Sequence, residues 1–313
     1  MKRRRILAGI ILAVVALGAF GSGAAVVIAS KGSQGALAQT ARRSPGQTLS
    51  ISCRSPSLGG SLPAEVYLPA GYSRRSSPYP VIYFLHGLPA GPSTYKANAF
   101  VADALAQGNL RAIVVAAQGA RASNSDREYL DWSSAENWPR AISHDLPSCI
   151  DHSYHTVANR LGRALIGVSA GGYGALNIGL RNLHTFAAVE SWSGYFVATD
   201  PSGEHVLELG STEADDNAIV PRGGALLEQL AVWPSMIGFY VGRQDGLFLP
   251  MNEQFHQALK QSSVAHTFRI YAGGHSGVLW RAQAPAWLGM ALRFMSAQAR
   301  HRSHDGGGGL GPT

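Results

Sequence analysis

The chain has 313 residues and a mass of 33.0 kDa, with 46% hydrophobic and 14% charged residues. This size suits one large α/β domain or two small ones. Residues 1–48 hold seven of the 26 Lys and Arg residues and no acid, so 19 basic residues balance the 19 acidic ones in the remainder. The formal charge of +7 therefore belongs to the N-terminal segment, and no stripe of basic and aromatic residues marks the rest. These features argue against nucleic acid as a partner.

The N-terminus has the pattern of an export signal. Lys2, Arg3, Arg4 and Arg5 precede an almost unbroken apolar run over residues 6–29, which matches a charged region followed by a hydrophobic one. The run is nearly long enough to span a bilayer, and the arginines would stay cytoplasmic. We expect residues 1–30 to be a signal anchor that contacts the membrane. The alternative is a signal peptide cleaved near residues 36–38, and both place the following domain outside the cytoplasm.

Composition divides the rest of the chain. Residues 31–48 are rich in Gly, Ser, Ala and Gln and predict a flexible linker, and the Gly-rich residues 301–313 predict a disordered tail. Residues 49–300 remain for the folded domain. Its two cysteines, Cys53 and Cys149, lack the spacing of metal ligands. An exported domain permits a disulfide between them, and two buried free thiols are the alternative, because sequence does not supply the Cα separation.

Strand and helix patterns alternate through residues 49–300, which predicts a mostly parallel sheet with helices on both faces. An antiparallel pair opens the domain at residues 49–54 and 64–68. Further strands are expected at residues 81–85, 112–117, 164–166, 187–189, 237–241 and 267–271, and helices at 97–107, 139–150, 173–180, 251–260 and 286–298. The connection from Tyr195 to Trp233 is too long for a turn. It predicts either a lid or substrate-binding excursion, or a plain surface insertion.

The glycines around Ser169 indicate a nucleophile. An apolar run ends in Gly167-Val168-Ser169-Ala170-Gly171, which fits G-x-S-x-G, the nucleophile elbow of α/β-hydrolases. A serine on a sharp strand-to-helix turn needs small neighbours two positions away, and Gly167 and Gly171 meet that need. A Gly-rich turn with an incidental serine would have the same motif, so the interpretation depends on its partners elsewhere.

Such a serine needs an imidazole base and an acid that orients it, in the chain order Ser, Asp or Glu, His. Asp245 follows the strand expected at residues 237–241, and His275 follows the last strand on a glycine-rich loop. We therefore expect Ser169, Asp245 and His275 to form a catalytic triad. Glu190, which directly follows the strand expected at residues 187–189, is a competing carboxylate, as are Asp200, Asp215 and Asp216 in the long connection. The other histidines considered lack the placement of His275: His256, His266, His301 and His304.

The oxyanion formed during ester attack needs two preorganised backbone N–H groups. Ala170, directly after the serine, is one expected donor, and Leu88 in the loop after the strand at residues 81–85 is the other. His86-Gly87 opens that loop. His86 has no partner at ligand spacing, so we expect a structural or oxyanion-loop role for it. We expect no cofactor and no metal.

Several segments together resemble the esterase D-like group of α/β-hydrolases, which includes S-formylglutathione hydrolases, feruloyl esterases and secreted mycolyltransferases. The segments are residues 67–69, 71–72, 79–87, 131–132, 144–147, 150–151, 167–174 and 274–276 with Trp280. The resemblance covers residues 49 to 295 and implies an α/β-hydrolase fold. It also implies catalytic Ser169, Asp245 and His275, with Leu88 and Ala170 as oxyanion donors.

Three positions depart from the mycolyltransferases. Those enzymes have Asp-Gly-Leu-Arg where this chain has His86-Gly87-Leu88-Pro89, and a Trp where it has Gly277. The departures argue against trehalose mycolyl transfer. We expect an exported serine esterase that hydrolyses small-molecule or cell-envelope acyl esters. The alternatives are an acyltransferase that passes the acyl group to a sugar hydroxyl, and a catalytically silent binding module of the cell wall.

Overall fold

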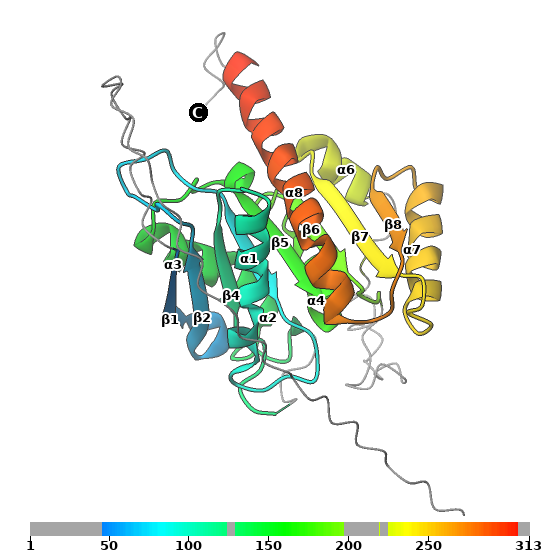
Figure 1. Cartoon of the computed structure of the whole chain (residues 1–313), viewed down its shortest axis with the longest axis horizontal. Helices are drawn as coiled ribbons and strands as arrows, with labels where there is room; N and C mark the ends of the chain where they lie inside the picture. The colour runs from blue at the N-terminus through cyan, green and yellow to red at the C-terminus, as the bar shows by residue number, and fades with distance from the viewer. Residues whose placement is uncertain (1–45, 124–128, 197–218, 220–224, 306–313) are drawn as a thin grey trace, which may run out of the picture. The chain divides into compact units, whose positions relative to one another are not determined.

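An eight-stranded sheet lies at the centre of the domain, and the computed structural model describes residues 46–123, 129–196, 219 and 225–305 (Figure 1). The strand order is β1-β2-β4-β3-β5-β6-β7-β8. β2 pairs antiparallel with β1 and β4, and the other neighbours are parallel. The strands are β1 (Gln47–Ser55), β2 (Gly60–Leu68), β3 (Val81–Leu85), β4 (Ile113–Ala117), β5 (Arg163–Val168), β6 (Ala188–Trp192), β7 (Met236–Gly242) and β8 (Thr267–Tyr271).

Helices cover both faces of the sheet. The helices α1 (Ala99–Gln107) and α8 (Gly277–Asp305) pack on one face. The other face carries α2 (Trp138–Arg140), α3 (Leu146–Ser153), α4 (Ala170–Arg181), α6 (Ala225–Val232) and α7 (Leu249–Gln261). A π-helical turn, η4 (Ala141–Asp145), joins α2 to α3, and short 3-10 turns lie at η1 (Pro56–Leu58), η2 (Thr94–Asn98) and η5 (Arg160–Gly162).

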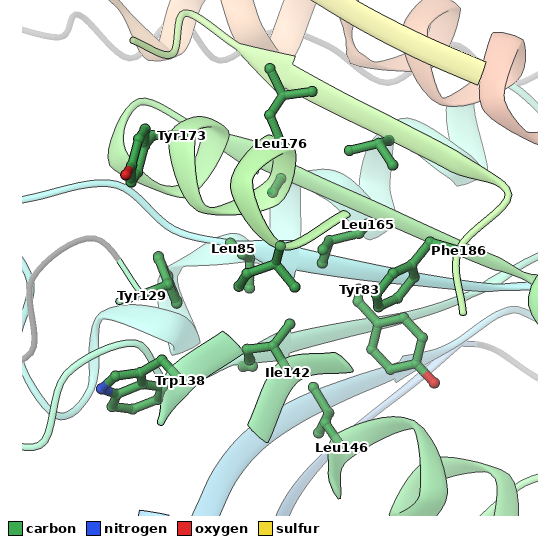
Figure 2. Close-up of a cluster of buried hydrophobic side chains, with 14 of the residues drawn as sticks. Tyr83, Leu85, Tyr129, Trp138, Ile142, Leu146, Leu165, Tyr173, Leu176 and Phe186 are labelled. Atoms are coloured by element: carbon green, nitrogen blue, oxygen red, sulfur yellow. The ribbon is translucent and has the colours of Figure 1, made fainter. Parts of the chain in front are cut away.

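β3 and β4 are continuous hydrophobic runs because both of their faces are covered. Every residue of β3 is buried. Since side chains alternate along a strand, Tyr83 and Leu85 join the core under α4, whereas Ile82 and Phe84 join the core under α1 and α8. Figure 2 shows Leu85 and Leu165 of the sheet between Leu176 of α4 and Ile142 of η4. Both layers thus hold the carboxyl ends of β3 and β5 rigidly.

The predicted α/β architecture is confirmed, and the strands at 81–85 and 267–271 match to the residue. The single helix expected at 139–150 is instead α2, η4 and α3. The π turn brings Asp145 to the β1–β2 turn, where its Oδ2 accepts hydrogen bonds from Ser55 Oγ (2.7 Å) and Ser57 N (3.1 Å). Helix α6 was not predicted.

The ends of the domain differ from the expectation. Gln47 and Thr48 belong to β1 rather than to a linker. Helix α8 starts at Gly277 instead of residue 286, because Leu279 and Ala284 are buried against the sheet on the N-terminal side of Pro285. It continues through Asp305, so the first five residues of the expected tail at 301–313 are helical.

Other expectations fall on residues that are not described. The signal anchor at residues 1–30 and most of the connection from Tyr195 to Trp233 lie outside the described ranges. Within those ranges, no helix combines the length and the apolar character needed to cross a membrane.

Cys53 of β1 and Cys149 of α3 form a disulfide, with their Cα atoms 5.8 Å apart. Of the two alternatives that the sequence left open, the structure therefore has the disulfide, and the free-thiol alternative is wrong. The disulfide ties an outer strand of the sheet to the helical layer beside it.

Candidate active site

Ser169 lies on a strained turn between β5 and α4. Its φ of 55° and ψ of −122° place a non-glycine residue in a sparsely populated backbone region, a kind of strain that clusters at active sites. A Cβ at Gly167 would lie 2.0 Å from the carbonyl oxygen of Gly171, and one at Gly171 would lie 2.1 Å from that of Leu85. Both glycines are therefore required by the turn, as the motif predicts.

His275 and Asp245 meet Ser169 at the carboxyl edge of the sheet. Asp245 follows β7, and His275 follows β8. The Nε2 atom of His275 lies 3.1 Å from Ser169 Oγ, and its Nδ1 lies 2.9 Å from Asp245 Oδ2. Asp245 is buried, and its Oδ1 accepts a hydrogen bond from Phe248 N at 3.2 Å. The structure thus brings together all three residues expected from the sequence.

This geometry sets the direction of the hydrogen bonds. An ionised carboxylate only accepts, so His275 Nδ1 donates to Asp245 and the Nε2 lone pair faces the Ser169 hydroxyl. The imidazole lies between the rings of Phe248 and Trp280, at centroid distances of 4.9 and 5.1 Å. Trp280 Nε1 donates a hydrogen bond to Ser193 Oγ at 3.0 Å, which fixes the indole ring beside the imidazole. The arrangement can take a proton from Ser169.

The two expected oxyanion donors flank the serine. Ala170 is the first residue of α4, where helix N–H groups have no intrahelical partner. Leu88 lies in the loop after β3. The preceding Gly87 is so close that a Cβ there would lie 2.9 Å from Ser169 Cβ. The loop therefore passes directly beside the serine.

His86 holds this loop. Its Nδ1 lies 3.0 Å from the Gly87 carbonyl oxygen, which can only accept, and Tyr129 Oη donates to the His86 carbonyl at 2.9 Å. Burial lowers the pKa of His86, which keeps the ring neutral. Because one planar peptide unit contains the Gly87 carbonyl and the Leu88 N–H, fixing the carbonyl also orients that N–H. This arrangement fits the loop role expected for His86.

The competing carboxylate and histidines have other partners. Glu190 is fully buried and accepts a hydrogen bond from Trp192 Nε1 at 3.0 Å. His256 and His266 pair with each other, Nδ1 to Nε2, at 2.7 Å. Asp200, Asp215 and Asp216 lie outside the described residues.

A pocket of about 300 Å³ opens over Ser169. Its walls include Leu88, Pro89, Phe100, Trp280 and Arg281. In the ranges that the structure describes, no group of three or more His, Cys, Asp or Glu side chains is placed to hold a metal ion. The sequence reasoning missed Phe248 and Arg281. Phe248 lies three residues after Asp245, a spacing that gives a weak signal, and no motif marks Arg281.

The strand order, the strained serine after β5 and the acid and histidine after β7 and β8 define an α/β-hydrolase. Within this class, the family model described as "Putative esterase" matches residues 55–290. The chain belongs to this esterase family.

Individual proteins match this chain either over a short segment or at low sequence identity. An iron(III) enterobactin esterase of Dickeya dadantii (strain 3937) is 32% identical over 121 residues, which are 37% of this chain and 26% of that protein. Among solved structures, a ferulic acid esterase has a TM-score of 0.66 at 22% identity, covering 80% of this chain and 99% of that one. An S-formylglutathione hydrolase from Agrobacterium tumefaciens has a TM-score of 0.62 at 20% identity, covering 80% and 96%. The matches to the curated relatives span only 19% to 30% of their lengths.

Proposed function

We propose that the chain hydrolyses carboxylic acyl esters through an acyl-enzyme on Ser169. The observation that carries the proposal is the unbroken relay from Asp245 through His275 to Ser169, with hydrogen bonds of 2.9 and 3.1 Å. His275 takes the hydroxyl proton as Ser169 attacks the carbonyl and then gives it to the leaving alcohol. Water, activated by the same imidazole, releases the acid. The N–H groups of Ala170 and Leu88 stabilise the oxyanion in both steps.

The substrate that we propose is an ester of a small molecule or of a cell-envelope component. Family membership and the modest pocket over Ser169 support a small acyl or alcohol group there. The names of the relatives, an enterobactin esterase and ferulic acid esterases, refer to small-molecule esters.

A fluorophosphonate probe tests the nucleophile, because it phosphonylates an activated serine. The wild-type domain should be labelled, and Ser169→Ala should not. Ser262→Ala, which removes an exposed serine at the end of α7, is the matched control and should be labelled like the wild type. Labelling that survives in Ser169→Ala would contradict the assignment.

Transfer of the acyl group to a sugar hydroxyl would use the same triad with the sugar in place of water. The ratio of free acid to acylated sugar, measured with and without an acceptor sugar, separates transfer from hydrolysis. A silent binding module would turn over no short-chain aryl ester. The relay to Ser169 argues against that alternative.

We also infer that the domain works outside the cytoplasm, either anchored at the membrane or secreted. The Cys53–Cys149 disulfide supports this location, because disulfides persist in oxidising compartments. The charged and apolar pattern of residues 1–30 supports it as well. Alkylation of thiols in intact host cells tests the inference. Recovery of both cysteines as free thiols would overturn it.

A further inference from the structure

Arg281 is the only residue with a fixed charge among the described residues that line the pocket over Ser169, and no Asp or Glu lines it. The guanidinium pairs with no carboxylate among the described residues. It is exposed at the rim, where it remains accessible to a ligand that enters the pocket. The mouth of the site therefore has a positive charge that nothing in the triad chemistry requires.

Neighbouring residues hold this guanidinium at the pocket. Arg281 Cζ lies 5.6 Å from the centroid of the Phe100 ring, within cation–π range. Phe100 packs edge-on against the buried Phe84 at 5.7 Å. The guanidinium also lies beside Gly277, one turn earlier on α8, where a Cβ would lie 2.9 Å from Arg281 Nη1. The cation is thus positioned before any ligand arrives.

The stability of the helix does not call for a cation at this position. Arg281 lies close to the N-terminus of α8, whose first turn contains no acidic residue. Helix N-termini carry partial positive charge and favour anions over cations. The N-terminus of α4 adds the same sign at Ser169. Because Arg281 gains nothing from the helix dipole, its placement at the pocket suggests a role in ligand binding rather than in helix stability.

We propose that the ester substrate carries a carboxylate that pairs with Arg281, an inference that rests on the ester hydrolysis proposed above. A guanidinium presents a planar fork of donors that matches the two oxygens of a carboxylate. An acidic residue lining the pocket would compete for that fork or repel the substrate, and none is found among the described lining residues. Arg281 is then a specificity residue that acts in binding, while the triad reacts with charged and neutral esters alike.

The test uses esters matched in size that differ in charge. For the acyl side, 4-nitrophenyl hemiadipate, whose longer chain disfavours attack of its carboxylate on its own ester, is compared with 4-nitrophenyl hexanoate. For the alcohol side, 4-carboxyphenyl butyrate is compared with 4-carbamoylphenyl butyrate. The kcat/KM ratio of each anionic ester to its neutral partner is measured for the wild type, Arg281→Gln and Arg281→Lys. The two pairs show which side of the ester reaches the arginine.

Arg293→Gln is the matched control. Arg293 is also exposed on α8, and its Nη1 lies 2.9 Å from the Cβ position of Gly289, four residues earlier, as in the Gly277–Arg281 pair. It lies about 18 Å further along the helix, at 1.5 Å per residue. The control removes the same charge from the same helix without changing the pocket.

In at least one pair, we expect the anionic-to-neutral kcat/KM ratio of the wild type to be about five times that of Arg281→Gln, as for an exposed ion pair. Arg281→Lys should retain part of this preference for the anionic ester, and added salt should reduce the preference of the wild type. Arg293→Gln should have the same ratio as the wild type. Two results would overturn this inference and leave the proposed function standing, provided that the neutral esters are hydrolysed. The first is an anionic-to-neutral kcat/KM ratio that is the same in the wild type and in Arg281→Gln for both pairs. The second is a fall in that ratio in Arg293→Gln as large as the fall in Arg281→Gln. No turnover of any ester by the wild type would overturn the proposed function as well.

Discussion

Glu190→Gln tests the energetic consequence of a carboxyl group buried in the middle of the sheet. Glu190 has no exposed surface, and burial is the main cause that raises its pKa from 4.5 to about 8, although hydrogen bonds from Trp192 and Tyr240 oppose the shift. A rise of about 3.5 units, at about 1.4 kcal/mol per unit, corresponds to about 5 kcal/mol. This energy is the cost of ionising the group in the folded state relative to the unfolded chain.

The sign follows from proton binding. Between about pH 4.5 and about pH 8, the folded state keeps the proton that the unfolded state releases, so stability falls as the pH rises through this window and levels off above it. Glutamine preserves the shape and the acceptor for Trp192 Nε1, but it does not ionise. Near pH 5 we expect the two proteins to differ by less than about 1 kcal/mol, and near pH 9 we expect the variant to be more stable by about 3–5 kcal/mol.

Urea unfolding at a series of pH values, with the disulfide intact, measures both curves. The variant should lose the fall in stability that the wild type shows between about pH 5 and about pH 8. Parallel curves for the two proteins would refute the reasoning, since the slope would then come from other groups. A variant that is less stable throughout would show that packing or hydrogen bonding outweighs the charge.

The remaining predictions concern the relay and the disulfide. Asp245→Asn should lower kcat about a thousand- to ten-thousand-fold, because an amide can donate to His275 Nδ1 and favour the wrong tautomer. The rate of hydrolysis of an aryl ester measures kcat. A loss below about tenfold would contradict the role of Asp245. Replacing both Cys53 and Cys149 by Ser should lower the free energy of unfolding by about 2–5 kcal/mol, because the bond joins residues 96 positions apart. Urea unfolding gives this difference, and unchanged stability would show that the unfolded chain is not constrained by the bond.

The positions of the strands and the chain order of the triad residues could be predicted from the sequence, because the local patterns and the expected topology agree. Buried parallel strands leave continuous apolar runs such as residues 81–85, and the loops that follow them carry Ser169, Asp245 and His275. The parallel topology then brings those loops to one edge of the sheet. The glycine spacing around Ser169 is a steric requirement of the turn, so it is visible in the sequence as well.

Other features depend on tertiary contacts that have no local signature. Helix α8 continues across Pro285 because buried neighbours on both sides hold it against the sheet, whereas the proline alone predicts a boundary. The π turn η4 places Asp145 beside Ser55, a partner 90 residues away. The position of Arg281 at the pocket depends on Phe100 from another part of the chain. None of these pairings can be deduced from spacing.

The Cys53–Cys149 bond also bears on how the domain responds to mechanical load. In the part of the chain that the structure describes, β1 is the first element, and it pairs on one side only, with β2. A pull on the chain from its N-terminal side therefore reaches β1 first, and the strand can peel from Gln47 onward. Peeling stops at Cys53, because the disulfide passes the force into α3 through a covalent bond. The strands that carry Ser169, Asp245 and His275 lie beyond that point and stay paired while the first residues of β1 yield.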